Sequence, residues 1–99
     1  MSERYTRRDA EAALGRLATA AGRPWTTGSP WMRRDDGKTV ALVGVWYLDY
    51  APLYGGYVVH EMANEAGGVS EPFGSRRRTA REFCEAVDFA VRAIQLVTL

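Results

Sequence analysis

The chain has 99 residues, enough for one folded domain and too few for two. Hydrophobic residues make up 46% of it and charged residues 25%, which excludes a disordered chain, and the net charge of +1 argues against a protein that coats nucleic acid over its whole surface. The single cysteine, Cys84, suits a reducing compartment, and the lack of a signal-peptide pattern or an apolar run of about 18 residues predicts a cytoplasmic protein outside the membrane.

The first predicted element is a helix over residues 6–21. Thr6 can cap its start, and Asp9 lies three residues later, where a carboxylate suits the positive end of the helix dipole. Gly22 followed by Pro24 is a typical helix stop. Small and aliphatic residues recur at helical spacing along one narrow stripe. We expect this helix to be structural, with no chemistry on it.

Three to four antiparallel strands are predicted between this helix and a second one. Their ranges are 31–34, 39–49, 57–63 and, for a short fourth strand, 69–73. The first two are joined by a hairpin turn at Gly37, because glycine tolerates the positive φ that such a turn requires. The longest strand is apolar on both faces, so it should be central or use one face for contact. Pro72 confines the fourth strand to an edge.

The second helix is predicted to begin after Thr79, which opens a capping-box pattern before an apolar run. Its apolar arc is wider than a sheet face covers, since Phe89, Ala93 and Leu96 extend it. Either the first helix packs alongside, or these three residues contact a second copy in a homodimer. The sequence thus predicts one α+β domain over 1–99, with an antiparallel sheet of three to four strands flanked by N-terminal and C-terminal helices.

No catalytic or metal-binding constellation is visible in the sequence. His60 is the only histidine and stands in a predicted strand, where a packing role is typical. Cys84 lies in the first turn of a helix, which can lower a thiol pKa, but at the edge of the apolar face, which favours a core residue. The two Gly-Gly pairs belong to no phosphate-loop motif, and no metal-ligand spacing occurs. We expect a protein that is not an enzyme and needs no metal or cofactor.

The densest charged feature is the run Arg76, Arg77 and Arg78 at the end of the loop 67–78. Arg81 lies one helical turn further on, and a helix N-terminus offers free N–H groups to an anion. With the order helix, three strands, helix, this run is similar to the double-stranded RNA-binding domain, where basic residues that open the final helix contact phosphates. That family favours lysine here, and its other contact regions have no match in this chain. The alternative is a solvated loop of arginines without a ligand.

Aromatic residues near the turns form a second candidate group. In strands, aromatic residues usually pack in the core, but tyrosines beside arginines are typical of protein-binding hot spots and can also stack on unpaired bases. The predicted partner-binding set is Tyr50, Tyr54, Tyr57, Phe73, Arg76, Arg77 and Arg78. The nucleic-acid alternative uses Arg76, Arg77, Arg78 and Arg81.

Three segments of the C-terminal half resemble small uncharacterised proteins of bacteriophages, notably those of high-GC actinobacteria. They are Tyr54-Gly-Gly-Tyr57, the eleven residues from Asn64 to Gly74, and Thr79-Ala-Arg-Glu-Phe83. The resemblance implies a viral accessory protein that acts in a bacterial host cytoplasm, and it brings no assigned activity or functional residue. The first hypothesis is therefore a non-enzymatic module that binds a host protein. The second is a nucleic-acid-binding module.

Overall fold

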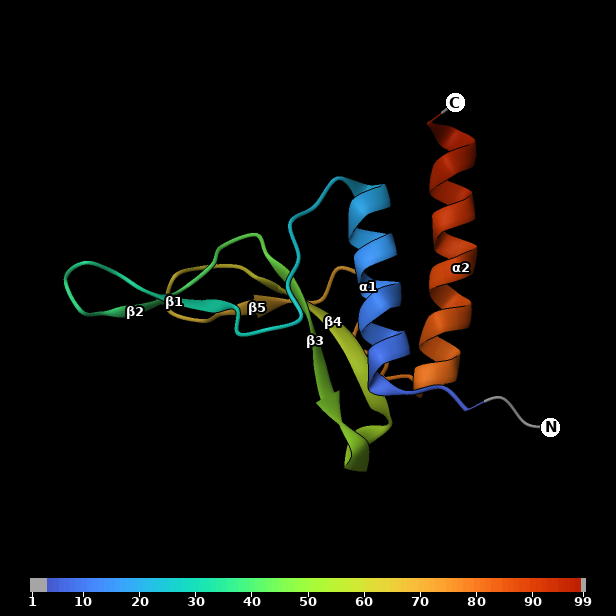
Figure 1. Ribbon diagram of the computed structural model, residues 1–99, viewed down its shortest axis with the longest axis horizontal. Helices are drawn as coiled ribbons and strands as arrows, with labels where there is room; N and C mark the ends of the chain where they lie inside the picture. Colours follow the sequence, from blue (N-terminus) through green and yellow to red (C-terminus); the bar gives the residue numbers. More distant parts are fainter. Residues whose placement is uncertain (1–3, 99) are drawn as a thin grey trace.

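Two helices lie side by side on one face of a small antiparallel sheet, and a β-hairpin extends away from them (Figure 1). The computed structural model describes residues 4–98. Its elements are α1 (Arg7–Ala21), β1 (Trp31–Arg33), β2 (Thr39–Ala41), β3 (Trp46–Ala51), the 3₁₀ turn η1 (Pro52–Tyr54), β4 (Gly56–Met62), β5 (Val69–Ser70) and α2 (Ala80–Val97). The predicted α+β class is confirmed.

Both helices begin at the caps that the sequence predicts. The Thr6 hydroxyl accepts a hydrogen bond from the Asp9 N–H at 3.3 Å, and the Asp9 carboxylate accepts one from the Thr6 N–H at 2.8 Å. Thr79 and Glu82 make the same reciprocal pair at the start of α2, at 3.2 and 2.9 Å. Each box satisfies N–H groups that have no partner within the helix, so the two starting points are defined locally.

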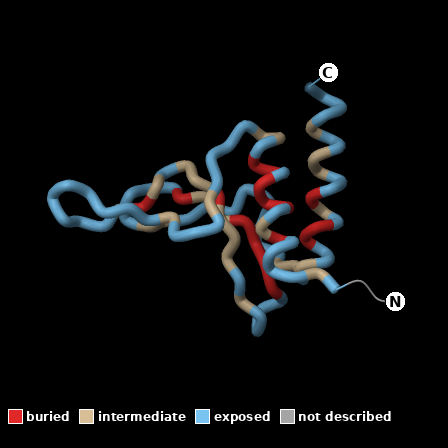
Figure 2. The backbone as a smooth tube through the Cα atoms, in the orientation of Figure 1, coloured by how far each residue is buried: buried red, intermediate tan, exposed pale blue. Residues whose placement is uncertain are grey.

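The contact between α1 and α2 builds the core. Alanines on the buried stripe of α1 allow close approach, and the buried segments lie where α1, α2 and β4 face one another (Figure 2). Helix–helix packing therefore accounts for one side of the wide apolar arc of α2. Within residues 4–98, neither helix has the length and apolar character to cross a membrane. The buried cluster comprises Ala10, Ala13, Leu14, Leu17, Ala18, Trp46, Tyr57, Val59, Phe83, Cys84 and Val87.

The strands form two sheets where one was expected. β1 pairs with β2 in a two-stranded hairpin, and the second sheet has the order β3-β4-β5. The single strand predicted over 39–49 is wrong, because the chain turns between β2 and β3. Gly44 adopts φ 85° there and donates its N–H to the Met62 carbonyl at 2.8 Å. Any residue with a side chain would be strained at that φ, so glycine permits the break between β2 and β3. The apolar residues on both sides of Gly44 are typical of a continuous strand, so the sequence does not reveal this break.

The remaining strands agree with the predicted positions within a few residues. β4 is the most buried strand and pairs antiparallel with β3, with Tyr50 opposite Tyr57. β5 is shorter than the predicted 69–73 and pairs only with β4, at the sheet edge. Pro72, predicted to lie inside this strand, lies beyond it, because proline has no N–H to donate to a ladder.

Candidate partner-binding surface

Arg77, in the loop 67–78, binds the turn between β3 and β4 by hydrogen bonds. We call residues 50–57 the tyrosine turn. The Arg77 Nη1 donates hydrogen bonds to the carbonyl oxygens of Asp49 and Gly56, both at 3.1 Å, and its Nη2 lies 2.5 Å from the Asp49 Oδ2. The Arg77 side chain is only 18% exposed. Because its donors are engaged within the molecule, Arg77 is a structural clamp on this turn and not a free basic group.

The side chains of Arg76, Arg77 and Arg78 point in different directions because of the backbone conformation. The Arg78 N–H donates to the Tyr57 carbonyl at 2.9 Å and the Tyr57 N–H donates back to the Arg78 carbonyl at 2.7 Å, so the loop is extended where it meets β4. Neighbouring side chains of an extended segment point to opposite sides. Arg77 accordingly turns toward Asp49 and Gly56, and Arg78 lines a pocket beside α2. Arg76, one residue before this extended part, is 73% exposed and lies 3.8 Å from Glu82. The cluster does not present one basic face.

Glycine is required where the loop crosses the turn. Gly56 has φ 115°, and a Cβ at this position would collide with the carbonyl oxygen of Arg78. The close approach lets the Arg78 carbonyl accept the Tyr57 N–H. Gly56 in the Gly-Gly pair thus serves backbone contact, in agreement with the turn interpretation of that pair.

Three large apolar side chains project from the tyrosine turn. Tyr50 is 47% exposed, Leu53 91% and Tyr54 79%. Tyr57, in contrast, is 6% exposed and belongs to the core cluster, with its ring centroid 4.5 Å from that of Tyr50. Burial, with a smaller effect from Tyr50, raises the pKa of the Tyr57 hydroxyl. Tyr57 therefore supports Tyr50 from below and offers no contact surface of its own.

Leu53 is missing from the set predicted by sequence. The pattern that could have revealed it is an aliphatic residue directly after Pro52, inside a turn where polar residues usually stand. In the structure Leu53 is the middle residue of η1, and it is the most exposed of the large hydrophobic residues within 4–98. Together with Pro52 and Tyr54 it forms an exposed run in the turn, separated by one residue from the exposed Tyr50.

A shallow hollow of about 500 Å³ adjoins the tyrosine turn. Both helices start at this end of the molecule (Figure 1), and the hollow is lined in part by Arg7, Thr79 and Ala80 from their first turns. The positive ends of two helix dipoles therefore lie beside the aromatic side chains. Each of these helix ends already carries a carboxylate in its capping box, Asp9 on α1 and Glu82 on α2, and Arg7 is paired with Glu11 at 2.9 Å.

The other residues singled out by sequence lie away from this turn. Phe73 is half-exposed, and its ring meets Trp46 edge-on at 5.3 Å. Arg81 is paired with Glu85 along α2 at 2.9 Å. Phe89, Ala93 and Leu96 are all exposed on the outer side of α2, and no other element of residues 4–98 covers them.

His60 and Cys84 lie apart, in separate environments. The His60 Nδ1 is 3.3 Å from the Tyr47 hydroxyl, and its Nε2 is 3.8 Å from Glu71. Cys84 is buried in the core, and this burial raises the pKa of its thiol, the opposite of activation by a helix dipole. Among residues 4–98, no group of three or more His, Cys, Asp or Glu side chains could hold a metal ion.

Comparison with known proteins identifies no relative: no family model, no curated protein sequence and no solved structure matches this chain.

Proposed function

We propose that this protein is a non-enzymatic binding module that contacts a partner protein through Tyr50, Leu53 and Tyr54. The observation that carries the proposal is their joint exposure on a turn that Arg77 holds in place. Contiguous exposed apolar side chains typically mark interaction sites. A contact surface that is already ordered loses less conformational entropy on binding, which favours affinity.

The partner that fits this surface presents apolar side chains. Tyr50, Leu53 and Tyr54 supply the apolar contact from this side. The resemblance to actinobacteriophage proteins that we infer from the sequence of segments 54–57, 64–74 and 79–83 leads us to propose a partner from the bacterial host, met in the host cytoplasm. Tyrosine is also among the residues enriched at the energetic centres of interfaces.

The nucleic-acid alternative finds no comparable support. It requires Arg76, Arg77 and Arg78 to reach phosphates together, yet Arg77 is engaged with Asp49 and the other two side chains lie in different surroundings. Binding that depends on several phosphate contacts weakens steeply with salt. A steep salt dependence of binding to DNA or RNA would therefore favour the alternative.

A differential capture experiment tests the proposal. We compare the wild-type protein, the double variant Leu53→Ser/Tyr54→Ser, and the control Phe89→Ser as baits in nuclease-treated lysate of an actinobacterial host. Phe89 matches Tyr54 closely in exposure but lies on α2, so the control removes one aromatic side chain of similar exposure from another surface. We expect the wild type and Phe89→Ser to retain the same protein and the double variant to retain less than about a tenth as much.

Two outcomes would contradict the proposal. In the first, the double variant retains the protein as well as the wild type does. In the second, Phe89→Ser loses it to the same extent. Because Leu53 and Tyr54 are highly exposed, all three proteins should unfold at nearly the same temperature, and this is checked by circular dichroism before the capture.

A further inference from the structure

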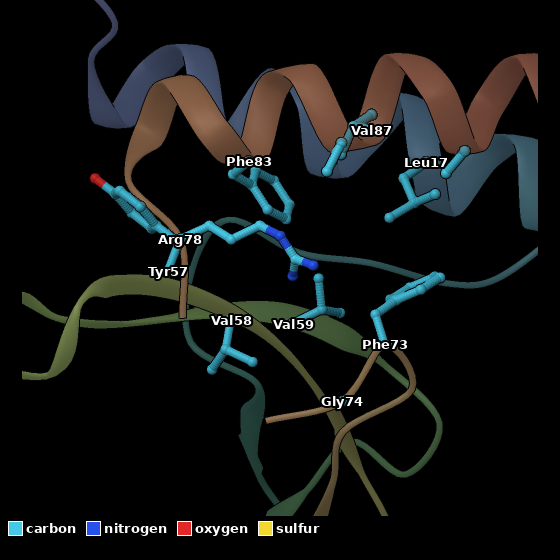
Figure 3. Close-up of a pocket in the computed structure, with 11 residues that line it drawn as sticks. Leu17, Tyr57, Val58, Val59, Phe73, Gly74, Arg78, Phe83 and Val87 are labelled. Atoms are coloured by element: carbon cyan, nitrogen blue, oxygen red, sulfur yellow. The ribbon is translucent and has the colours of Figure 1, made fainter. Parts of the chain in front are cut away.

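A second, separate pocket opens between α2, β4 and the loop 71–78 (Figure 3). It has a volume of about 220 Å³. Most of its wall is apolar, and the side chains that matter for binding are Val58, Val59, Phe73, Phe83, Ala86 and Ala90. Of the eleven residues that line it, Arg78 is the only charged one, and no carboxylate belongs to the lining.

The Arg78 guanidinium enters this pocket, and no side chain of the described residues 4–98 pairs with it. Figure 3 shows its side chain extending into the space between Phe83 and Val59. Among residues 4–98, the guanidinium makes no side-chain hydrogen bond and no ion pair within 4.0 Å, although Arg77 beside it makes three hydrogen bonds. The charge of Arg78 contributes to the lowered pKa of Glu82, but the Glu82 carboxylate accepts a hydrogen bond from the Thr79 N–H and lies near Arg76.

The position of this side chain is set by the backbone and not by the charge. The two hydrogen bonds between Arg78 and Tyr57 fix the Cα of Arg78 against β4, and the alternation with Arg77 directs the side chain inward. A guanidinium among apolar side chains gives up part of its hydration, and this cost is recovered when a carboxylate accepts two parallel hydrogen bonds from it. The positive charge of Arg78 in this pocket is therefore suited to pair with the carboxylate of a bound ligand.

We propose that this pocket binds a carboxylate attached to an apolar body about the size of one aromatic ring. A cavity of about 150 Å³ holds benzene, so 220 Å³ suffices for a ring and a short carboxylate arm. The ring would lie against Phe73, Phe83 and Val59, and the carboxylate would pair with Arg78. Two sources share this chemistry: a free small acid, and the C-terminal residue of a polypeptide. The site shares the buried Tyr57 with the tyrosine turn but includes none of its exposed side chains Tyr50, Leu53 and Tyr54.

Ligand titration followed by NMR tests the proposal with the full-length ¹⁵N-labelled protein. The probes are 3-phenylpropanoate, which represents a free acid, and N-acetyl-Ala-Phe with a free carboxylate, which represents a chain end, each compared with its primary amide. We expect saturable shifts at Val58, Val59 and Phe83, with each acid binding at least about tenfold more tightly than its amide. The acid that binds more tightly identifies the source.

Variants connect the acid preference to the guanidinium. Arg78→Gln should remove the difference between acid and amide, whereas Arg76→Gln removes the same charge two residues away and should leave the difference intact. Ala86→Leu should fill the pocket and abolish binding of every probe. Since the Arg78 side chain has no partner among residues 4–98, Arg78→Gln should keep the wild-type amide spectrum.

Three results would overturn the proposal. They are equal affinity of acid and amide for the wild type, an acid preference that survives in Arg78→Gln, and the lack of saturable shifts with both acids up to about 10 mM.

Discussion

Replacing Arg77 by alanine should destabilise the fold far more than replacing its neighbour Arg76. Arg77 joins the loop before α2 to both ends of the tyrosine turn, through the Asp49 carbonyl, the Gly56 carbonyl and the Asp49 carboxylate. Arg76 has only a long contact with Glu82 at the surface. Two arginines that are adjacent in sequence therefore have very different structural roles.

The magnitude follows from these contacts. A hydrogen bond to a charged group contributes roughly 1.5–3 kcal/mol, but Asp49 is 40% exposed and can regain water when Arg77 is removed. We therefore expect a loss below the sum of three such bonds, about 2–4 kcal/mol of unfolding free energy. For a domain of this size, such a loss lowers the unfolding temperature by about 10–20 °C. Exposed ion pairs contribute little, so Arg76→Ala should leave the unfolding temperature nearly unchanged.

Urea and thermal unfolding of Arg77→Ala, Arg76→Ala and Arg77→Lys provide the measurement. Arg77→Lys should fall between the wild type and Arg77→Ala, because an ammonium lacks the planar fork that serves several acceptors at once. A double-mutant cycle with Asp49→Asn should give a coupling energy above about 1 kcal/mol. The clamp would be refuted if Arg77→Ala and Arg76→Ala unfolded at the same urea concentration, or if the cycle showed no coupling.

Three further predictions concern the fold. Gly56→Ala should lower the unfolding free energy by more than about 2 kcal/mol, because the added Cβ would collide with backbone atoms. Gly44 has open space around it, so Gly44→Ala should lower the unfolding free energy by about 1 kcal/mol, from its positive φ alone. Equal losses would contradict the close approach at Gly56. Leu14→Ala should lower the unfolding free energy by about 2–5 kcal/mol and Phe89→Ala should leave it nearly unchanged, since Leu14 is fully buried and Phe89 is 78% exposed. A large loss from Phe89→Ala would mean that the Phe89 side chain is covered in solution. Burial raises the pKa of the Cys84 thiol above its value in the unfolded chain, about 8.5, so the folded state holds this proton more strongly. The stability of the wild type relative to Cys84→Ala should therefore be constant below about pH 8 and fall as pH rises beyond it, and a difference that stays constant from pH 7 to pH 10 would contradict this.

The sequence predicts the helices well because their signals are local. Thr6 with Asp9 and Thr79 with Glu82 lie three residues apart, so the caps can be read without knowledge of the rest of the chain. The strand break at Gly44 was missed because apolar β-formers surround it, and one glycine in such a run is compatible with a continuous strand. The hydrogen bond from Gly44 to Met62 that stabilises the turn joins distant parts of the sequence.

The sequence predicts Tyr50 and Tyr54 as part of the candidate surface, but it centres that surface on the loop 67–78 and does not predict Leu53. Turn patterns and aromatic content pointed to Tyr50 and Tyr54, which are exposed. The burial of Tyr57 depends on the two helices that pack above β4, and the engagement of Arg77 depends on Asp49, 28 residues away. Three identical side chains in a row give no local sign of which one turns inward.

Site-directed photo-crosslinking tests the central claim most directly, because it reports which surface meets the partner. A benzoylphenylalanine replaces Tyr54 in one protein and Phe89 in another, two positions of nearly equal exposure on different elements. After irradiation in host lysate, we predict one discrete protein adduct from position 54, insensitive to nuclease, and none from position 89. An adduct from position 89 without one from position 54, or an adduct with nucleic acid in place of protein, would contradict the account.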